Sequence, residues 1–496
     1  MNASEQGSDK GNGGLFSRRS TPPMVAVDLG AGSCRVSLLR WVNGAPDVSV
    51  LHRFLNAPVP DGHSIRWDLD TICAGVEYGL RQCAEQSDQP IASIGVDGWA
   101  VDYVRLKDDG MPQAPPFCYR DPRNEPAELA VHQRISEPQL YALTGLQRLG
   151  FNTIYQLFAD KLAGIPDALP WVNLPEYVLH RLGARRVSEY TNATHTGLID
   201  LRTKSWSLEI FNVLGFDLSA APELVPSGTD LGLLQGPLAA LPAFKATRLI
   251  APACHDTASA IAAIAHQGDD WAYLSSGTWS LLGTLQAQPL NSEAAYTANF
   301  TNLGAAGGGI CFHKSVNGMW LIQQCLDHWT RSGSALNLSE LIEAAAKLNP
   351  PEVLLEVDHP ELMLPGDMPG RINKRRAEAG LAGIPEDRDH APAFASLIFH
   401  SLAAKYAEVL RELAQVTGKH FNTLHVVGGG GRNALLNRLT AEATGLELRL
   451  GHVESSTIGN LAIQMAVFDH RERPGASLSL EQIGLCACQL EAARYE

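Results

Sequence analysis

The chain has 496 residues, enough for two or three domains that each bury a core of their own. Hydrophobic residues make up 45% of it, which excludes a mostly disordered chain, and the charged share of 19% favours a compact α/β enzyme over a coiled coil. The formal net charge of −14 disfavours nucleic acid and anionic membrane surfaces as partners. Because no apolar run is long enough to cross a bilayer, an integral membrane protein is also excluded.

The N-terminus and the cysteines indicate the compartment. The first twenty residues are polar and rich in Gly and Ser, without the apolar stretch of a signal peptide, so we expect a disordered tail over residues 1–22. The nine cysteines are scattered, odd in number and without a CxxC pair, which favours reduced and mostly buried thiols. Both features predict a cytoplasmic protein.

The ordered chain is expected to open with a short buried strand that runs into a glycine-containing turn. Two further strands, an amphipathic helix and another strand follow, which gives a β-β-β-α-β opening. The segment 119–242 is rich in Pro, Gly and aromatic residues and predicts helices joined by long loops, suitable for a substrate-binding insert. The opening elements are expected at 24–30, 35–41, 48–54, 69–84 and 91–96.

A second opening of the same kind appears at residues 271–283, which again predict a strand, a polar glycine turn and a strand. Two halves that begin alike indicate an internally duplicated fold with two domains, 23–266 and 267–496. The other elements alternate between strands and helices. Strands are expected at 248–251, 423–427 and 447–450, and helices at 258–265, 392–416, 432–444 and 457–468.

The first glycine turn follows a carboxylate, Asp28, at the end of a strand. Glycine lets the backbone approach a phosphate closely, and the N–H groups of such a turn donate to its oxygens. Ser33 and Arg35 add a hydroxyl and a cation, and Asp28 is suited to a hydrated Mg²⁺. The second turn, 275–280, repeats this pattern. Each turn alone is compatible with a plain hairpin, but together they can hold a triphosphate from both sides of a cleft.

Four consecutive glycines, 428–431, follow an apolar strand and precede a helix. The pattern is not GxGxxG, because Arg432 and Asn433 occupy the next positions, so an NAD-dependent oxidoreductase is disfavoured. The segment fits either a structural strand–helix turn or a flat backbone platform at a helix N-terminus that touches adenine, ribose or phosphate.

Two further segments place carboxylates beside other polar groups. Asp256, in the sequence His255-Asp256-Thr257, lies between a strand and a small-residue helix, where it either caps the helix or accepts a proton from a sugar hydroxyl. Residues 97–102 put a Trp and two carboxylates at a strand end, either as a turn with a core Trp or as a sugar-binding edge. With no HExxH motif and no Cys/His cluster, a zinc site is not expected.

Together these segments resemble the FGGY family of carbohydrate kinases, which have the actin/hexokinase/Hsp70-type ATPase fold. The stretches that carry the resemblance keep the family's order from about Val25 to Gln464, so the likeness covers most of the chain. They are VAVDLGAGSCRVSLL, IGVDGWAVDYV, YRDPR, FNTIYQL, EYTNATHTGLI, HDTASAI, YLSSGTWSLLG, NGMWLIQ, VVGGGGRNALLN and STIGNLAIQ.

The resemblance implies an α/β fold of two ribonuclease-H-like domains around a central cleft, the first binding the sugar and the second the nucleotide. It implies ATP, Mg²⁺ and phosphorylation of a small-molecule ketose at O1, with L-rhamnulose as the ketose of the nearest subgroup. By motif match, Asp256 is expected as the catalytic base and Asp28 as the metal-binding residue. The expected ATP contacts are Ala31, Gly32, Ser33, Cys34, Arg35, Gly277, Thr278, Gln323, Gly429 and Gly430. The expected sugar contacts are Trp99, Ala100, Asp102, His255, Asp256, Thr257 and Ser315.

Two of these positions depart from the subgroup's pattern. The pattern has Gly in TWGVDF where this chain has Ala100, and Asn where this chain has Ser315, although Asn317 stands nearby. Because a lost hydrogen bond to a substrate hydroxyl can shift selectivity strongly, other ketoses such as L-fuculose, L-ribulose and D-xylulose stay open. A sugar-sensing relative without catalysis is a further alternative, against which the intact Asp256 and Thr278 count. The sequence leaves the oligomeric state undecided.

Overall fold

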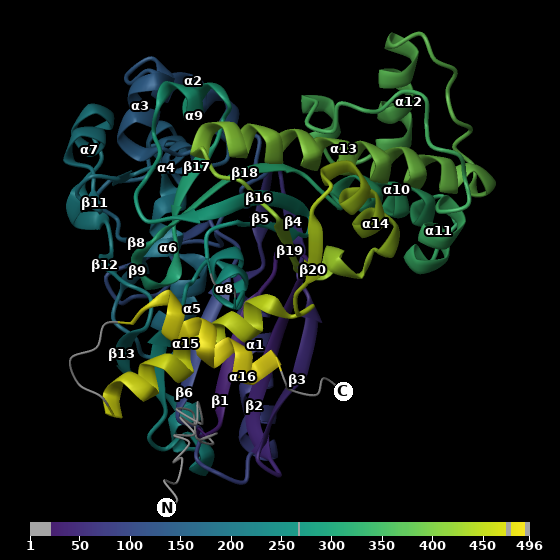
Figure 1. Ribbon diagram of the computed structural model, residues 1–496. Coiled ribbons are helices and arrows are strands. Elements are labelled where there is room, and N and C mark those ends of the chain that lie inside the picture. Colours follow the sequence, from purple (N-terminus) through teal and green to yellow (C-terminus); the bar gives the residue numbers. More distant parts are fainter. Residues whose placement is uncertain (1–20, 266–267, 473–477, 492–496) are drawn as a thin grey trace, which may run out of the picture.

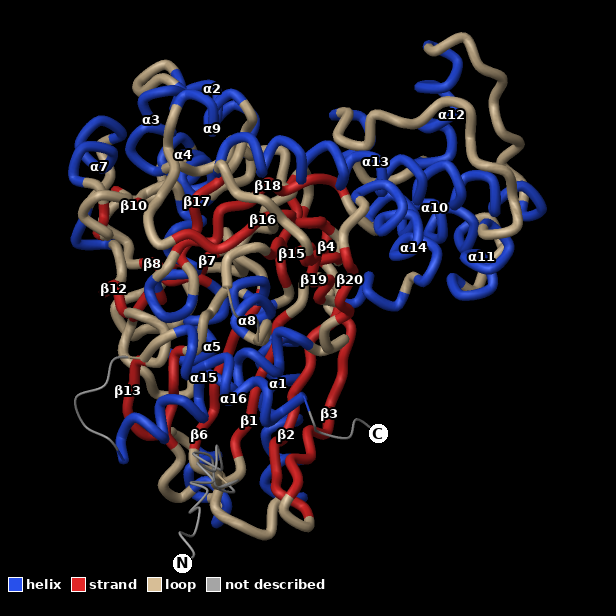
Figure 2. The backbone as a smooth tube through the Cα atoms, in the orientation of Figure 1, coloured by secondary structure: helices blue, strands red, loops and turns tan. Residues whose placement is uncertain are grey.

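The computed structural model describes residues 21–265, 268–472 and 478–491 (Figure 1). The expected tail, apart from its last two residues, lies outside the described residues, and so does the expected domain boundary between residues 266 and 267. That division of the chain therefore stays a prediction. The described chain forms two six-stranded sheets, one from each half of the sequence, with helices packed against them (Figure 2).

The first sheet is built from the N-terminal half. In spatial order its strands are β13 Thr229–Leu233, β14 Arg248–Ala251, β6 Ser93–Gly98, β1 Met24–Leu29, β2 Ser33–Val42 and β3 Ala45–Leu55. Strand β1 pairs antiparallel with β2 and parallel with β6. The apolar face of helix α1, Leu69–Gln86, packs on β2 and β3, and its first turn is capped by Asp68, which accepts from the Thr71 N–H at 3.0 Å. The expected β-β-β-α-β opening is therefore confirmed, except that a short hairpin of two further strands precedes the helix.

The second sheet repeats the centre of the first. In spatial order its strands are β17 Thr301–Gly304, β18 Ile310–Asn317, β16 Trp279–Gln286, β15 Trp271–Ser276, β19 Thr423–Val427 and β20 Glu447–Leu450. Strand β15 pairs antiparallel with β16 and parallel with β19, as β1 does with β2 and β6. The turns of the β1–β2 and β15–β16 hairpins thus occupy equivalent places, which confirms the predicted duplication.

A mostly helical insert separates β6 from β13 and β14 and has a core of its own around Phe158, Trp171 and Phe211. This agrees with the helices and long loops expected for 119–242, although short strand pairs also occur there. Its main elements are β7 Tyr103–Arg105, α2 Asn124–His132, α3 Glu137–Thr144, α4 Thr153–Leu162, β8 Trp171–Asn173, α5 Leu174–Arg181, β9 Val187–Glu189, α6 Tyr190–Ala193, β10 Ile199–Asp200, β11 Ser205–Trp206, α7 Leu208–Leu214 and β12 Glu223–Val225. A separate hairpin, β4 Pro58–Asp61 with β5 Ser64–Trp67, follows β3.

The longest helix of the second half is α13, Ala391–Thr417, which packs on β16 and buries Phe394 and Leu402 in the core of that half. Its Tyr406 hydroxyl shares a hydrogen bond of 2.7 Å with Ser280 of β16. In Figure 1, α12 stands away from the sheet at the upper right, with α11 below it. Between the two halves lies α8 Asp256–Ala262, and the second half also contains α9 Glu293–Thr297, α10 Trp320–Arg331, α11 Leu338–Ala345, α12 Met368–Glu378 and α14 Ala434–Thr444.

The last two helices, α15 Ser455–Glu472 and α16 Leu480–Glu491, return to the first sheet (Figure 1). Gln464 of α15 is buried there: its amide donates to the Val25 carbonyl at 3.0 Å and its Oε1 accepts from Ser93 Oγ at 2.6 Å. Helix α15 also crosses α8 very closely, because a Cβ on Gly459 would lie 1.7 Å from the Ser259 carbonyl oxygen. The C-terminal helices therefore pack against the N-terminal half of the molecule.

Two sequence predictions concern the state of the cysteines and the presence of membrane-spanning helices. Every cysteine except Cys488 is a buried free thiol, as expected, and burial together with the Asp28 charge raises the pKa of Cys34 to about 12. Within the part of the chain that the structure describes, no helix combines the length and the apolar character needed to span a membrane.

Candidate active site

A cavity of about 430 Å³ lies between the two sheets, at the strand ends that carry the two hairpin turns. Most residues expected from the sequence line it, and they come from both halves of the chain. These lining residues are Asp28, Ala31, Gly32, Ser33, Arg35, Trp99, Ala100, His255, Asp256, Thr257, Gly277, Thr278, Ser315 and Gly429.

Both glycine turns and the third glycine segment reach the cavity. The first turn carries the Ser33 hydroxyl, whose buried oxygen has no hydrogen-bond partner among the described residues. The backbone of Gly428 has φ +86°, and a Cβ there would lie 2.9 Å from the Ser276 carbonyl, so the chain after β19 approaches the second turn as only glycine permits. A hydroxyl without a partner, placed among glycine turns, can donate a hydrogen bond to an oxygen of a bound phosphate.

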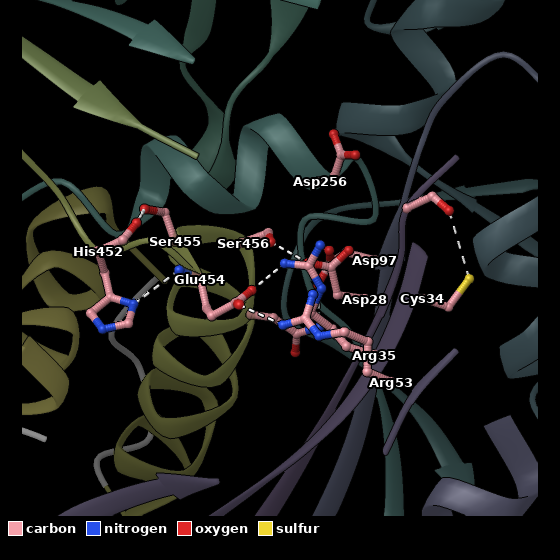
Figure 3. Close-up of polar contacts among 12 residues, drawn as sticks. Asp28, Cys34, Arg35, Arg53, Asp97, Asp256, His452, Glu454, Ser455 and Ser456 are labelled. Carbon is pink, nitrogen blue, oxygen red and sulfur yellow. Dashed lines mark hydrogen bonds and ion pairs between the residues drawn. The ribbon is translucent and has the colours of Figure 1, made fainter. Parts of the chain in front are cut away.

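Two carboxylates of the cavity lining, Asp28 and Asp256, lie near a third, Asp97, which is buried beside Asp28 (Figure 3). Asp28 and Asp97 are register partners on the parallel strands β1 and β6, and Asp256 is the first residue of α8. Asp97 is fully buried, and burial, followed by the charge of Asp28, raises its pKa well above the usual value. One of its oxygens accepts from Asn460 Nδ2 at 2.5 Å, whereas the other has no partner among the described residues.

An ion-pair network joins the first turn to the start of α15. The Arg35 guanidinium lies 3.6 Å from Asp28 and also pairs with Glu454, which in turn binds Arg53 at 2.7 Å (Figure 3). The Ser456 hydroxyl donates to Asp28. Burial opposes ionisation of Glu454, but the two arginine charges outweigh it and lower the pKa of that carboxyl. The network holds Arg35 beside Asp28 at the cavity wall, where its charge suits a phosphate or a carboxylate.

Asp256 has the surroundings of a base. Its side chain is 31% exposed and opens on the cavity, and the start of α8 has no side-chain capping hydrogen bond, so the capping interpretation is not supported. Burial in the site, then the nearby charge of Asp28, raises the pKa of Asp256 to about 7. A group of this pKa can accept a proton near neutral pH. The Thr257 hydroxyl donates to the carboxylate at 3.2 Å.

Asp102 lies behind the cavity wall instead of lining it. Its carboxylate accepts from the indole N–H of Trp67 at 2.5 Å, from that of Trp99 at 2.9 Å and from the Gln156 amide at 3.1 Å. Despite these donors, burial raises its pKa to about 6. The geometry therefore makes Asp102 a support for Trp99, which does line the cavity, and direct sugar contact by Asp102 stays a prediction.

The remaining expected ATP contacts lie outside the cavity lining. Cys34 is buried behind the first turn, and its Sγ–H donates to a carbonyl of that turn at 3.7 Å. Gly430 packs so tightly that a Cβ would lie 1.9 Å from Ser276 Oγ. Gln323 is exposed on α10, where its amide donates to Asp327 at 3.0 Å. Their roles as nucleotide contacts stay predictions.

The two positions that depart from the subgroup's pattern, Ala100 and Ser315, both line the cavity. Gln147 fixes the backbone of Ser315: its Nε2 donates to the Ser315 carbonyl at 3.1 Å and its Oε1 accepts from the Ser315 N–H at 2.9 Å. Asn317 does not line the cavity, and its amide donates to the Val357 and Leu362 carbonyls. Asn317 is therefore not placed to substitute for the missing amide.

Several lining residues were not expected from the sequence, although most belong to stretches that carry the family resemblance. The sequence signal that could have found them is their position: they are polar or aromatic residues inside a stretch that recurs in the family in the same order. Gln147 lies outside every such stretch. Among these unexpected residues are Tyr119, Gln147, Phe151, Asn152, His195 and Ser456.

Comparison with known proteins agrees with this arrangement. The models for the N-terminal and C-terminal domains of the FGGY family of carbohydrate kinases match residues 23–263 and 272–467. The chain therefore belongs to the FGGY family of carbohydrate kinases. Among curated proteins it is 36% identical over 464 residues to the rhamnulokinase of Enterococcus faecalis, covering 92% of each chain. It is 34% identical over 448 residues to that of Oceanobacillus iheyensis, covering 90% of this chain and 93% of the relative.

Solved structures share the fold at low sequence identity. A xylulose kinase from Lactobacillus acidophilus matches with a TM-score of 0.73 at 16% identity, covering 94% of this chain and 92% of that one. A glycerol kinase from Plasmodium falciparum, solved with ADP, matches with a TM-score of 0.71 at 13% identity and the same coverage. The two-domain α/β fold expected from the sequence is confirmed.

Proposed function

We propose that this kinase transfers the γ-phosphoryl group of ATP to O1 of L-rhamnulose. The observation that carries the proposal is the position of Asp256, which opens on the cavity close to Asp28 and has a pKa raised by burial to about 7. The choice of sugar is supported by the rhamnulokinases to which the chain is similar. The buried free thiols are consistent with the cytoplasmic location that the sequence predicts.

In the proposed reaction Asp256 orients the sugar hydroxyl and removes its proton. O1 forms a bond to the γ-phosphorus, the bond from that phosphorus to the β–γ bridging oxygen breaks, and ADP leaves with that oxygen. The proton from O1 ends on the Asp256 carboxylate. Such a base need not be strong, because phosphoryl transfer depends mainly on positioning and charge neutralisation.

The phosphates would be held by the two glycine turns, with the Ser33 hydroxyl and the Arg35 guanidinium on one side and the backbone of Thr278 on the other. Bound Mg²⁺ would neutralise charge on the β- and γ-phosphates, and the Asp28 carboxylate is the group suited to hold it through water. Arg35 also keeps the cluster of carboxylates from repelling the nucleotide, since its charge lies 3.6 Å from Asp28.

The experiment is ADP release in a coupled assay across L-rhamnulose, L-fuculose, L-ribulose and D-xylulose, with a sugar-free control. Selective turnover of L-rhamnulose supports the proposal, and selective turnover of another ketose replaces the sugar but keeps the reaction. Ala100→Gly and Ser315→Asn restore the subgroup's pattern at the two cavity positions. If L-rhamnulose is the substrate, these variants are expected to change KM for the sugar and to leave KM for ATP within about two-fold, because both side chains lie where the sugar is read.

A further inference from the structure

We infer that His195 is a positioning residue that holds the imidazole of His255 in the tautomer whose Nε2–H faces Asp256. The inference rests on the proposed function, in which Asp256 is the base. His195 belongs to the helical insert, and the proposed reaction gives it no role of its own.

The two imidazoles lie against each other at the cavity wall. His195 Nε2 is 3.0 Å from His255 Nδ1, and the ring centroids are 4.0 Å apart at an interplanar angle of 62°. The other nitrogen of His255, Nε2, lies 3.5 Å from Asp256 Oδ1. All three side chains line the cavity, so they form a chain of contacts that ends at the proposed base.

The protonation of the pair follows from this geometry. Burial lowers the pKa of His255 to about 3, and burial, followed by His255 and His313, lowers that of His195 well below its usual value, so both rings are neutral near pH 7. Each ring then carries a single N–H. The ionised Asp256 carboxylate, which is the form that acts as base, only accepts, so the His255 proton then belongs on Nε2, toward Asp256. Its Nδ1 is then a lone pair, and the hydrogen of the 3.0 Å contact comes from His195 Nε2.

The backbone around His195 is tied at several points. His195 is the middle residue of a short 3₁₀ turn, Thr194–Thr196. The Thr194 hydroxyl accepts from the Gly304 N–H of β17 at 2.9 Å, and the Thr196 hydroxyl donates to the Ala193 carbonyl at 2.6 Å. The imidazole is therefore presented by a turn that is closed by its own hydrogen bond and anchored to the second sheet.

The same segment also holds the backbone of the two residues that precede the base. The Thr191 hydroxyl of α6 accepts from the His255 N–H at 3.3 Å, and the Glu189 carboxylate accepts from the Cys254 N–H at 2.9 Å. The stretch 189–195 of the insert thus positions both the ring and the main chain of His255. Without the His195 donor only the 3.5 Å contact to Asp256 favours this tautomer, so the other tautomer, which turns a lone pair toward the Asp256 carboxylate, becomes populated.

The kinetic test compares His195→Phe with His195→Gln. Phe keeps a ring but removes the donor, so kcat is expected to fall about 10- to 100-fold with KM for ATP within about two-fold, since misplacement of a reacting group costs on this scale. Gln offers an amide N–H in place of the imidazole donor and is expected to recover most of the loss. His132→Phe is the matched control: its Nε2 lies 2.9 Å from the Tyr155 hydroxyl, it does not line the cavity, and kcat should be unchanged.

The second readout is the tautomer itself, from NMR of the protein labelled with ¹⁵N-histidine, with His255 assigned through His255→Asn. We expect a protonated Nε2 and a bare Nδ1 on His255 in the natural chain, and loss of that tautomer in His195→Phe. A protonated Nδ1 on His255 in the natural chain, or a His195→Phe enzyme with unchanged kcat, would overturn the inference. If the proposed function fails, no ketose is turned over or Asp256→Asn stays active, whereas the tautomer readout still decides the role of His195.

Discussion

Asn460 and Asp97, which are 363 residues apart in the chain, are joined by a hydrogen bond of 2.5 Å from the amide Nδ2 to the buried carboxylate. The contact belongs to a polar stripe on α15 in which Ser456, Asn460 and Gln464 follow each other at intervals of four residues and reach Asp28, Asp97 and the backbone of β1. Helix α15 thus supports the carboxylates of a site that come from the other half of the chain.

Replacement of Asn460 by Ala should therefore destabilise the protein through Asp97. The change leaves a fully buried carboxylate without its donor, which is expected to cost about 1–3 kcal/mol of the free energy of unfolding. Chemical denaturation measures the loss. Where the pH is high enough to ionise Asp97, Asp97→Asn in the Asn460→Ala background should recover part of the loss, because the buried amide carries no charge. Asn212→Ala, on the exposed face of α7, is the control and should change little. Equal stability of Asn460→Ala and the natural protein would show that the bond contributes nothing.

If Asp256 is the base, its replacement by Asn should lower activity without lowering stability. Asp256→Asn keeps the shape of the side chain but removes the proton acceptor, so kcat should fall about 10²- to 10⁴-fold. The melting temperature should not fall, because the substitution removes a carboxylate whose pKa burial has raised to about 7. Coupled ADP release and a thermal melt on the same samples measure both effects. Full turnover by Asp256→Asn would contradict the assignment.

Glu176 gives a prediction about pH and stability. Burial raises its pKa to about 8 in the folded protein, from 4.5 for an exposed glutamate. Between these two values the folded state binds a proton that the unfolded state has lost, so the glutamate's contribution to stability falls as the pH rises from about 4.5 to about 8. Glu176→Gln lacks this dependence and should gain in stability relative to the natural chain over that window.

Denaturation of Glu176→Gln and the natural chain at a series of pH values between 4.5 and 9 tests whether the stability difference grows with pH as predicted. Glu209→Gln, at an exposed position in the first turn of α7, serves as the control and should keep the natural pH profile. A stability difference between the Glu176→Gln variant and the natural chain that stays constant across the series would mean that Glu176 is not held protonated in the fold.

The close crossing of α15 and α8 predicts that Gly459 cannot carry a side chain. A Cβ there would lie 1.7 Å from the Ser259 carbonyl oxygen, so Gly459→Ala forces the helices apart and should cost about 1–3 kcal/mol or more. Because α8 starts with Asp256, kcat should fall as well. The control is Gly484→Ala, also within a helix, where the nearest atom to a Cβ would be the Ala265 Cα at 3.9 Å. Comparable melting temperatures for the two variants would refute the steric argument.

The sequence predicted those parts of the fold that depend on local patterns. The strand over Met24–Leu29, the helix that begins at Leu69 and the glycine turn between β15 and β16 all follow from residue periodicity and from glycines within a few positions. The resemblance of the motifs to a family then pointed to residues most of which line the cavity, since the same short stretches surround it.

The parts that the sequence did not predict depend on contacts between distant segments. Nothing near Gln464 indicates that α15 packs on the first sheet, and nothing near His195 indicates a partner 60 residues further along the chain. Asp102 stands in a motif expected at the sugar, but the indole donors of Trp67 and Trp99 turn its carboxylate into the wall. Tertiary packing decides such orientations, and periodicity carries no information about it.

The most direct test of the account is to identify the product. The protein is incubated with ATP, Mg²⁺ and L-rhamnulose labelled with ¹³C at C1, and the mixture is followed by ³¹P and ¹³C NMR. The account predicts a phosphomonoester whose phosphorus couples to C1, formed in step with ADP and absent with Asp256→Asn. ADP that accompanies only inorganic phosphate, or a phosphate attached to another carbon, would contradict transfer to O1.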